Sequence, residues 1–563
     1  MHTPTCPVKM AGTLQRCCAN RHCVITDAIF GVWFFTVKQG VGLRFHDMPT
    51  RLPFDQLLVP VREIRARMTA ARLAGYSSAL VFLPLSPTDA DWKALPHGGV
   101  LRRLFALKVR KAGDCFHLRV GTRAQTLVIV ACLPEEAGTF ERLQAAGKLA
   151  RSALDGEPQS LLLWQQGCAP DAANASFNAM VAALEAAAFR FASFKSKPKP
   201  RARLQRIDIA MGRKLPDLDL TLATSAGNNL ARWLTALPPN TLDARGYRRL
   251  LQEISRRLKI RYTFYGETQL KRLGAGAFLA VARGNATRDA GIALLSYRPQ
   301  ASGPRAGGRS GAAPAISLVG KGICFDTGGT NLKPHKSMLD MHTDMQGSAV
   351  AVGSLYALQA LRSPLPVDCW LAITENRIGP LAYKPQDVVR AYNGTTIQVI
   401  HTDAEGRMVL ADALGLAAAR KPRAIIDYAT LTGACVYALT ERYSGAFTNR
   451  PDTRNVIESA GSSSGERVWC FPMDADFDTD LESQVADVLQ CAIDGKGDHI
   501  LAARFLSRFV PKEIAWLHLD LAAGSRHGGL GHIATEITGF GVRYTLELLR
   551  RGWPGAHAAA PRK

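Results

Sequence analysis

The sequence predicts an α/β protein of two domains, an N-terminal α/β domain followed by a C-terminal α/β domain with a central mixed sheet. A chain of 563 residues is about three to four times longer than a typical domain. Hydrophobic residues make up 47% and charged residues 21%, which suits a globular protein with large cores and excludes a disordered chain. Short apolar runs alternate with helix-like stretches along the chain, which is typical of α/β folds.

The first predicted domain covers residues 48–220. Residues 1–47 are rich in cysteine and lack periodicity, so we interpret them as an extension or as the result of a misplaced start codon. A more regular pattern begins at Met48. After it, we expect strands at 79–83, 126–132 and 160–164, and helices at 138–154 and 172–188.

A basic segment, residues 195–206, lies near the end of this domain. Its two prolines and six basic side chains prevent a helix and leave little to bury, so a linker and a mobile hairpin both stay open. The chain as a whole carries a net charge of +23, which is spread over both domains. Because such a charge attracts nucleic acid, we keep DNA as an alternative partner that is less favoured than peptides.

The second predicted domain covers residues 221–551, and a flexible tail is expected at 552–563. Two prolines at 238–239 stop a helix, and residues 301–313 form a loop rich in glycine, serine and arginine. Helices are expected at 228–237 and 243–258, and strands at 316–319, 370–374, 397–400, 424–429 and 516–521.

Cysteine content and hydropathy bear on the compartment. The chain has 12 cysteines over its whole length and no pattern of a disulfide framework, which favours a reducing cytoplasm. The most apolar early stretch, residues 28–37, is too short to cross a bilayer. We therefore expect a cytoplasmic protein without a signal peptide or a membrane-spanning helix.

Charged residues that follow predicted strands are the strongest indication of chemistry. Lys321 and Asp326 lie at the end of an apolar strand, beside glycines that let the backbone approach a ligand closely. Asp344 precedes a helix-like segment. Asp403 and Glu405 follow another strand, and in an extended chain the side chains at i and i+2 face the same side.

Carboxylates that converge in this way repel one another unless a cation or a shared proton neutralises them. Several oxygen ligands without a zinc-finger pattern of Cys and His suit a hydrolytic centre with two divalent ions. Arg407, just before a helix expected at 408–419, is placed to hold a small anion. Lys333 supplies a further positive charge for a polarised carbonyl oxygen.

These motifs resemble the leucyl (cytosol) aminopeptidase family, whose members are di-zinc exopeptidases. The resemblance covers roughly residues 228–549, and a weaker match in the first half is similar to the family's macro-like domain. It rests on the order and spacing of five segments, namely 319–329, Lys333-Pro334, Asp344-Met345, 402–407 and 429–435.

The resemblance implies a homohexameric enzyme that removes N-terminal residues, leucine and other apolar residues among them, from peptides. Asp326 and Glu405 would bridge two Zn or Mn ions, with Lys321 (as a neutral amine) and Asp344 on the looser ion and Asp403 on the tighter one. A metal-bridging water would attack the peptide carbonyl.

By the same resemblance, Lys333 and Arg407 are catalytic. Lys333 would stabilise the oxyanion, and Arg407 would hold a bicarbonate that moves the proton. The substrate's α-amino group would bind the looser ion. The pocket for its first side chain would be lined by Met341, Thr430, Leu431 and Gly433.

The sequence departs from the family pattern at several positions. His401 replaces a usual Asn, Gln346 a Gly and Thr327 a Ser, and residues 375–380 lack the usual Met-Pro-Ser segment. None of these changes removes an expected metal ligand, but they make leucine preference less secure than aminopeptidase chemistry. Two other hypotheses stay open: a DNA-binding architectural protein, and a peptidase-like protein that His401 and Gln346 have deprived of turnover.

Overall fold

The computed structural model describes residues 52–65, 68–111, 113–121, 125–132, 137–198, 203–211, 217–299 and 314–554. The expectations for residues 1–47 and for the loop 301–313 therefore lie outside the described residues. The same holds for most of the expected tail. Trp553, which the tail prediction includes, is only 3% exposed, and its indole donates to Thr453 at 3.2 Å.

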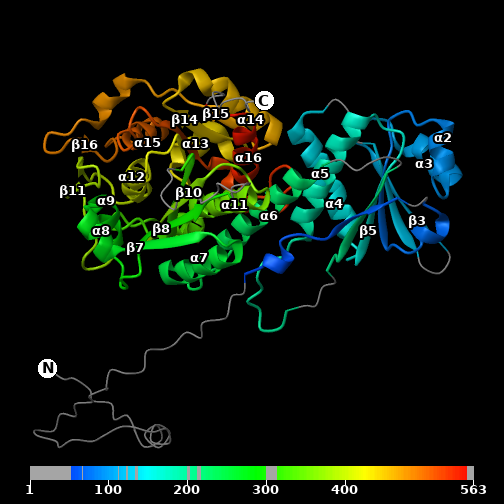
Figure 1. Ribbon diagram of the computed structural model, residues 1–563, viewed down its shortest axis with the longest axis horizontal. Helices are drawn as coiled ribbons and strands as arrows, with labels where there is room; N and C mark the ends of the chain where they lie inside the picture. The colour runs from blue at the N-terminus through cyan, green and yellow to red at the C-terminus, as the bar shows by residue number, and fades with distance from the viewer. Residues whose placement is uncertain are drawn as a thin grey trace, which may run out of the picture. The chain divides into compact units, whose positions relative to one another are not determined.

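A six-stranded sheet forms the centre of the N-terminal part (Figure 1). Its order is β1-β6-β5-β2-β4-β3, and all neighbours are parallel except β3 and β4. The three expected strands are confirmed within two residues at their ends. The strands are β1 (Val61–Ile64), β2 (Ser78–Phe82), β3 (Cys115–Val120), β4 (Thr126–Ala131), β5 (Ser160–Gln165) and β6 (Arg206–Met211).

Helices cover both faces of this sheet because its buried strands carry apolar side chains on both sides. Leu80 and Phe82 pack into a core with α4 and α5, whereas Val81 packs toward α3. Both long helices that the periodicity predicted are present. The helices are α1 (Ala70–Leu73), α2 (Asp89–Ala94), α3 (Gly98–Lys108), α4 (Thr139–Leu154) and α5 (Pro170–Ala188), after a short 3-10 turn η1 (Phe54–Gln56).

The basic segment 195–206 is described only in part. Residues 195–198 are exposed, and residues 199–202 lie outside the described part of the chain. Arg206 already belongs to β6 and pairs with Asp208 at 2.7 Å, so the end of the segment is a strand and not a linker. DNA binding stays a prediction.

The C-terminal part contains the central mixed sheet that the sequence predicts. Its order is β15-β14-β17-β13-β9-β10-β8-β7. The four central strands β17, β13, β9 and β10 are parallel to one another. Toward the edges, β14 is antiparallel to β17, β8 is antiparallel to β10, and β7 is antiparallel to β8. The strands are β7 (Arg261–Gly266), β8 (Gly291–Tyr297), β9 (Ile316–Asp326), β10 (Val367–Asn376), β13 (Ala424–Ala429), β14 (Ser444–Thr448), β15 (Val468–Cys470) and β17 (Ala515–Asp520).

The expected strand at 397–400 belongs to a different, smaller sheet. This sheet has the order β11-β12-β16, with strands β11 (Val388–Arg390), β12 (Thr396–Gln398) and β16 (Val488–Leu489). Its strands are only two or three residues long. They frame the loop that leads to Asp403.

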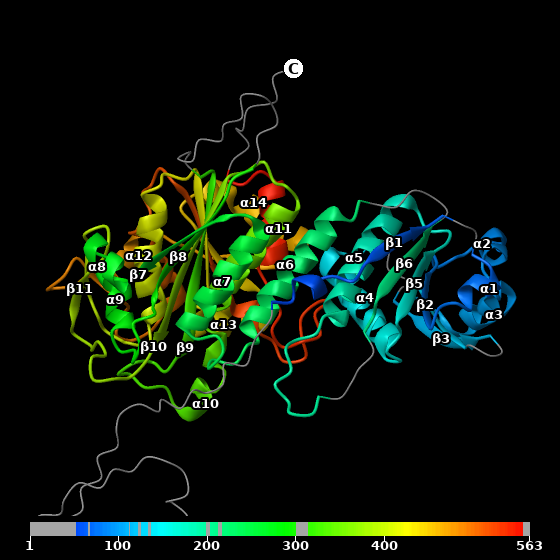
Figure 2. The ribbon, with the colours of Figure 1, turned by 60° about the horizontal axis from the view of Figure 1, so that its bottom comes forward.

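Two layers of helices enclose the central sheet (Figure 2). Along β9, Leu318 packs into the core with α6, α7, α11, α14 and α16, whereas its neighbour Val319 packs into the core with α9, α12 and α15. Strand alternation thus buries both faces. The first layer comprises α6 (Asp219–Thr235), α7 (Ala244–Leu258), α11 (Gln346–Ala360), α14 (Arg454–Ser464) and α16 (Val542–Arg550), and the second α9 (Gly276–Ala282), α12 (Glu405–Ala418) and α15 (Asp498–Ser507).

Shorter elements complete the domain, and its helix ends follow local rules. The Asp243 side chain accepts from Gly246 N–H at 2.6 Å and so caps α7, which begins one residue after the expected start. In the described residues, no helix is long and apolar enough to cross a membrane. The remaining elements are α8 (Glu267–Leu273), α10 (His335–Met338), η2 (Met341–Thr343), α13 (Gly433–Leu439), η3 (Thr440–Arg442), η4 (Pro451–Thr453), η5 (Ala475–Leu481) and η6 (Ala522–Gly524).

Candidate metal centre

The candidate site lies where the central parallel strands end. Asp326 is the last residue of β9, Asn376 is the last residue of β10, and Thr430 follows the end of β13. Because parallel strands expose their carboxyl ends at one edge, this is where α/β sheets usually bind ligands.

The glycine-rich turn after β9 folds back over the site. Gly328 has φ +86°, and a Cβ at this position would lie 2.4 Å from Asn331 O and 3.0 Å from Asp403 Oδ1. Only glycine fits this conformation and this close approach. The turn is closed by a hydrogen bond from Lys333 N–H to Thr327 O at 2.9 Å, which returns Lys333 to the cluster.

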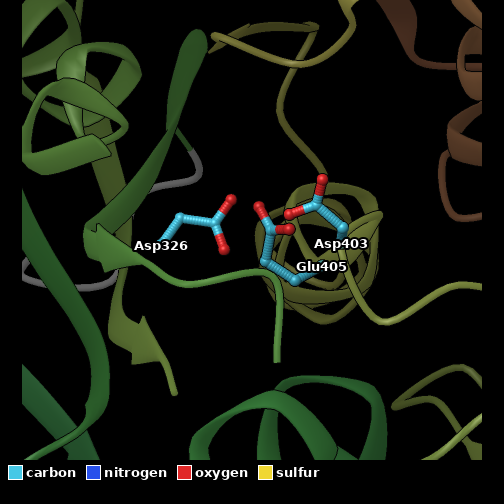
Figure 3. A group of neighbouring side chains, drawn as sticks. All are labelled: Asp326, Asp403 and Glu405. Atoms are coloured by element: carbon cyan, nitrogen blue, oxygen red, sulfur yellow. The ribbon is translucent and has the colours of Figure 1, made fainter. Parts of the chain in front are cut away.

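Three carboxylates, those of Asp326, Asp403 and Glu405, point toward one another (Figure 3). One oxygen from each lies within 4.8 Å of the others. The two acids after β12 therefore converge as expected, but the expected reason was wrong. The chain between them is not extended: Asp403 lies in a turn and Glu405 is the first residue of α12.

Two lysines link these carboxylates and Asp344. Lys321 Nζ lies 2.9 Å from Asp344 Oδ1 and 2.8 Å from Glu405 Oε1. Lys333 Nζ lies 3.0 Å from Asp326 Oδ2 and 2.6 Å from Asp403 Oδ1. All six charged residues that the sequence analysis placed at the metals and the oxyanion thus form one connected group, although their roles stay predictions.

The electrostatics of this group are unusual because it is buried. Burial, together with the neighbouring Glu405 and Asp326, raises the pKa of Asp344. Burial and then Asp326 likewise raise the pKa values of Glu405 and Asp403. Burial alone would lower the pKa of Lys321, but the attraction of Asp344, Glu405 and Asp326 outweighs it and raises that pKa.

The chemistry of this group fits divalent cations. Four carboxylates face only two lysines, so with its acids ionised the buried cluster would carry excess negative charge. Asp344 Oδ2 is a buried oxygen with no hydrogen-bond partner among the described residues. Carboxylate oxygens suit Mn²⁺ and also bind Zn²⁺, and a neutral lysine amine could add a nitrogen ligand.

Neighbouring polar groups fix the carboxylates, and the sequence analysis did not identify them. Asn376 Nδ2 donates to Asp326 Oδ1 at 2.8 Å and to Thr402 O at 3.0 Å. The Tyr383 hydroxyl donates to the same Thr402 carbonyl at 2.8 Å. Asn376 was hidden in the segment that departs from the family pattern, where only its place at the end of a strand could have drawn attention.

Gln490 holds the loop before α12 and was also missed. Its Oε1 accepts from the N–H groups of Ile400 at 3.0 Å and His401 at 3.1 Å, and its Nε2 donates to Ala404 O at 2.9 Å. It lies roughly ninety positions along the chain from the loop that it supports, and no local motif marks it.

Arg407 lies in the first turn of α12, and its guanidinium is already engaged. Its Nη2 donates to both carboxylate oxygens of Asp498, each at 2.8 Å, and its Nη1 donates to Gln490 O at 3.3 Å. Arg407 itself is 1% exposed. The structure thus differs from an open anion site, because an internal carboxylate already pairs with Arg407. The bicarbonate expected there stays a prediction.

Of the expected pocket residues, Thr430 contacts the charged cluster directly. Thr430 Oγ1 donates to Asp344 Oδ1 at 2.6 Å. Leu431 follows it and is partly buried, and Met341 begins the η2 turn just before Asp344. A Cβ at Gly433 would meet nothing within 4 Å, so space is open there. Their role in binding a substrate side chain stays a prediction.

Two of the departing residues also lie beside the site. His401 Nδ1 accepts from Asp403 N–H at 3.3 Å, and burial followed by the charge of Lys333 lowers the pKa of His401. Gln346 Nε2 donates to Ser525 Oγ at 2.8 Å. Neither side chain takes the place of a carboxylate or lysine of the cluster.

Comparisons with known proteins agree on one family. Residues 229–546 match the family described as "Cytosol aminopeptidase family, catalytic domain". A probable cytosol aminopeptidase of Prochlorococcus marinus is 34% identical over 448 residues, which cover 77% of this chain and 86% of that protein. Another, of Chlorobium limicola, is 37% identical over 331 residues, which cover 59% of this chain and 63% of that protein, less than two thirds of its length.

A solved structure is similar over most of the chain. The bottromycin maturation enzyme BotP in complex with Mn superposes with a TM-score of 0.71 at 29% identity, covering 84% of this chain and 99% of BotP. The family match spans more than half of the 563 residues, and the Prochlorococcus relative is matched over more than two thirds of both chains. This chain therefore belongs to the cytosol aminopeptidase family of metal-dependent, leucyl aminopeptidase-type hydrolases.

Proposed function

We propose that this protein is an aminopeptidase that uses two divalent ions, Mn or Zn, to release N-terminal residues from peptides. The observation that carries this proposal is the buried group of four carboxylates and two lysines at the strand ends. Its excess negative charge and its short distances suit a pair of cations. The Mn in the BotP structure supports the same class of ion.

Different residues of the cluster would bind the two metal ions. Asp326 and Glu405 lie in the middle of the group and would contact both ions, while Lys321 and Asp344 would complete one site and Asp403 the other. When bound, such ions lower the pKa of a water molecule and polarise a carbonyl group. With such ions bound, Lys321 would be released from its ion pairs as a neutral amine, because a cation would neutralise Asp344 and Glu405 in its place.

Lys333 is the residue we propose for oxyanion stabilisation. It is held 3.0 Å from Asp326 and 2.6 Å from Asp403 by the turn that Gly328 permits. Its ammonium is only partly exposed, so its charge acts on a developing oxyanion with little screening by water.

We propose leucine and other apolar residues as the preferred N-terminal side chains, bound near Met341, Thr430, Leu431 and Gly433. The free α-amino group of the substrate would bind at the Asp344 side of the cluster, which confines cleavage to the first peptide bond. We further propose residues 221–551 as the catalytic domain, residues 48–220 as a macro-like domain, a cytoplasmic homohexamer as the working form, and peptides as its partners.

A substrate profile tests this function. Purified protein would be stripped of metal, reloaded with Mn²⁺ or Zn²⁺, and assayed on amides of leucine, methionine, alanine, arginine and glutamate. We expect hydrolysis that depends on metal and is fastest for apolar residues, and no cleavage of N-acetyl-leucinamide. A metal-loaded protein that cleaves none of the free amides would refute the proposal, and the same protein in a salt-dependent gel shift would then test the DNA-binding hypothesis.

A further inference from the structure

Asp498 is a charged residue beside the site to which no role has yet been assigned. It contributes both of its oxygens to Arg407 Nη2 at 2.8 Å. Its side chain is 26% exposed, whereas that of Arg407 is 2% exposed. The pair therefore lies at the boundary between the buried site and solvent, with the carboxylate on the solvent side.

The turn before α15 and the first residue of this helix fix the position of the Asp498 carboxylate. Gly497 takes the left-handed conformation with φ +62°, and Asp498 is the first residue of the ten-residue helix α15. A negative charge is favourable at a helix N-terminus. Two independent elements, the first turn of α12 and the first turn of α15, thus bring the arginine and the carboxylate together.

The pair adjoins the reacting groups. Arg407 lies two residues after Glu405, and the residue between them, Gly406, packs directly on Lys321: a Cβ there would lie 2.7 Å from Lys321 Nζ. On the other side, Gln490 O accepts from Arg407 Nη1 at 3.3 Å, and Gln490 Oε1 accepts from His401 N–H at 3.1 Å. Asp498 is therefore linked, through Arg407 and Gln490, to the loop that carries Asp403.

We propose that Asp498 is a positioning residue that supplies Arg407 with a built-in carboxylate, so that hydrolysis by this protein needs no bicarbonate. The inference rests on the proposed aminopeptidase function. A carboxylate and a bicarbonate can each bind an arginine guanidinium in the same way, through two coplanar oxygens that share a negative charge. A group joined by a flexible tether already has an effective concentration in the roughly millimolar range, and the fold holds the Asp498 carboxylate in direct contact with Arg407. Dissolved bicarbonate therefore competes poorly with Asp498 for Arg407.

The test compares the wild type with Asp498→Gly in buffer depleted of carbon dioxide, with and without added sodium bicarbonate. We expect the wild-type kcat/KM on leucinamide to change less than about twofold. Asp498→Gly should lose about 10- to 100-fold, as is usual for outer partners of metal sites, and regain most of it with bicarbonate or formate. Asp494→Gly is the matched control, since Asp494 lies in the same loop, is exposed and pairs with Lys496.

A binding measurement separates this inference from the proposed function. In ¹³C NMR with labelled bicarbonate, the wild type should cause no specific line broadening, whereas Asp498→Gly should bind the anion. Wild-type activity that rises fivefold or more with bicarbonate, or bicarbonate binding to the wild type, would overturn the inference. So would a folded Asp498→Gly variant that keeps full activity without bicarbonate, or one that neither bicarbonate nor formate rescues. If the wild type cleaves no substrate, the proposed function fails, and the NMR result alone then tests whether Asp498 takes the place of bicarbonate. If Asp498→Gly does not fold, the bicarbonate dependence of wild-type activity and the wild-type NMR measurement test the inference.

Discussion

Substituting Gln490 by alanine tests how the site loop is held. Gln490 is fully buried, and its amide serves three backbone groups of the 400–404 loop: the N–H groups of Ile400 and His401 and the carbonyl of Ala404. That loop carries Asp403 and leads into Glu405. Alanine removes all three hydrogen bonds and keeps the backbone of residue 490 in place.

The structure sets the size of the effect. A buried backbone group that loses its partner costs about 1–3 kcal/mol, and water entering the vacated space keeps each cost near the lower limit. Three groups then lower the stability of the catalytic domain by about 3 kcal/mol, which corresponds to a melting temperature lower by on the order of 5 °C. Because the loop also positions Asp403, the affinity for Mn²⁺ should fall about 10- to 100-fold.

Differential scanning fluorimetry of the metal-free protein and calorimetric titration with Mn²⁺ measure the two effects. Gln398→Ala is the control, because the Gln398 side chain bonds only with the side chains of Gln386 and Ser483 among the described residues, toward the surface. It should change neither quantity appreciably. If Gln490→Ala melts within 1 °C of the wild type and binds Mn²⁺ equally well, the loop is not held as described.

Three further predictions concern the charged cluster. Since burial raises the pKa of Asp344 to about 8 and that of Glu405 to about 7, the metal-free fold binds more protons than the unfolded chain, so its melting temperature should fall between pH 5 and 8. Mn²⁺ should reverse this fall, and a metal-free protein that becomes more stable over this range would contradict the assignment. Lys333→Met should lower kcat by about 10²- to 10³-fold with Mn²⁺ content unchanged by mass spectrometry; an unchanged kcat would remove the oxyanion role. Gly406→Ala places a Cβ 2.7 Å from Lys321 Nζ and should weaken Mn²⁺ binding about tenfold by calorimetry, whereas equal affinity would show that Lys321 is not a ligand.

The sequence predicts most of the architecture where a local pattern decides the structure. The strand at 424–429 is matched without any shift, because it is a mainly apolar run, interrupted only by Asp427, and all of its residues are buried. The helix start expected at 408 was late, because the acidic and glycine residues 403–406 resemble a loop, whereas α12 begins at Glu405. The strand expected at 316–319 extends to Asp326. The glycines and Lys321 in its second half hid this extension, but pairing with β10 continues there, with a register shift before Asp326.

In the candidate site, too, the residues in local motifs could be predicted from the sequence, whereas those brought in by tertiary packing could not. The carboxylates and lysines stand in short motifs, so their pattern and the family resemblance that it carries identified them. Asn376, Gln490 and Asp498 complete the site from positions up to about ninety residues away, and only the packing of strands and helices brings them near. The surroundings of Arg407 were missed for this reason: the sequence shows the arginine but not the distant carboxylate that pairs with it.

The central claim is that this cluster binds the metal ions that drive hydrolysis. Titration of metal-free protein with Mn²⁺, with bound metal and leucinamide hydrolysis measured on the same samples, tests it most directly when wild type and Glu405→Gln are compared. The account predicts two ions per wild-type chain, activity that rises with their occupancy, and loss of both in the variant. Hydrolysis that persists in metal-free protein, or Mn²⁺ binding and activity that survive Glu405→Gln unchanged, would contradict it.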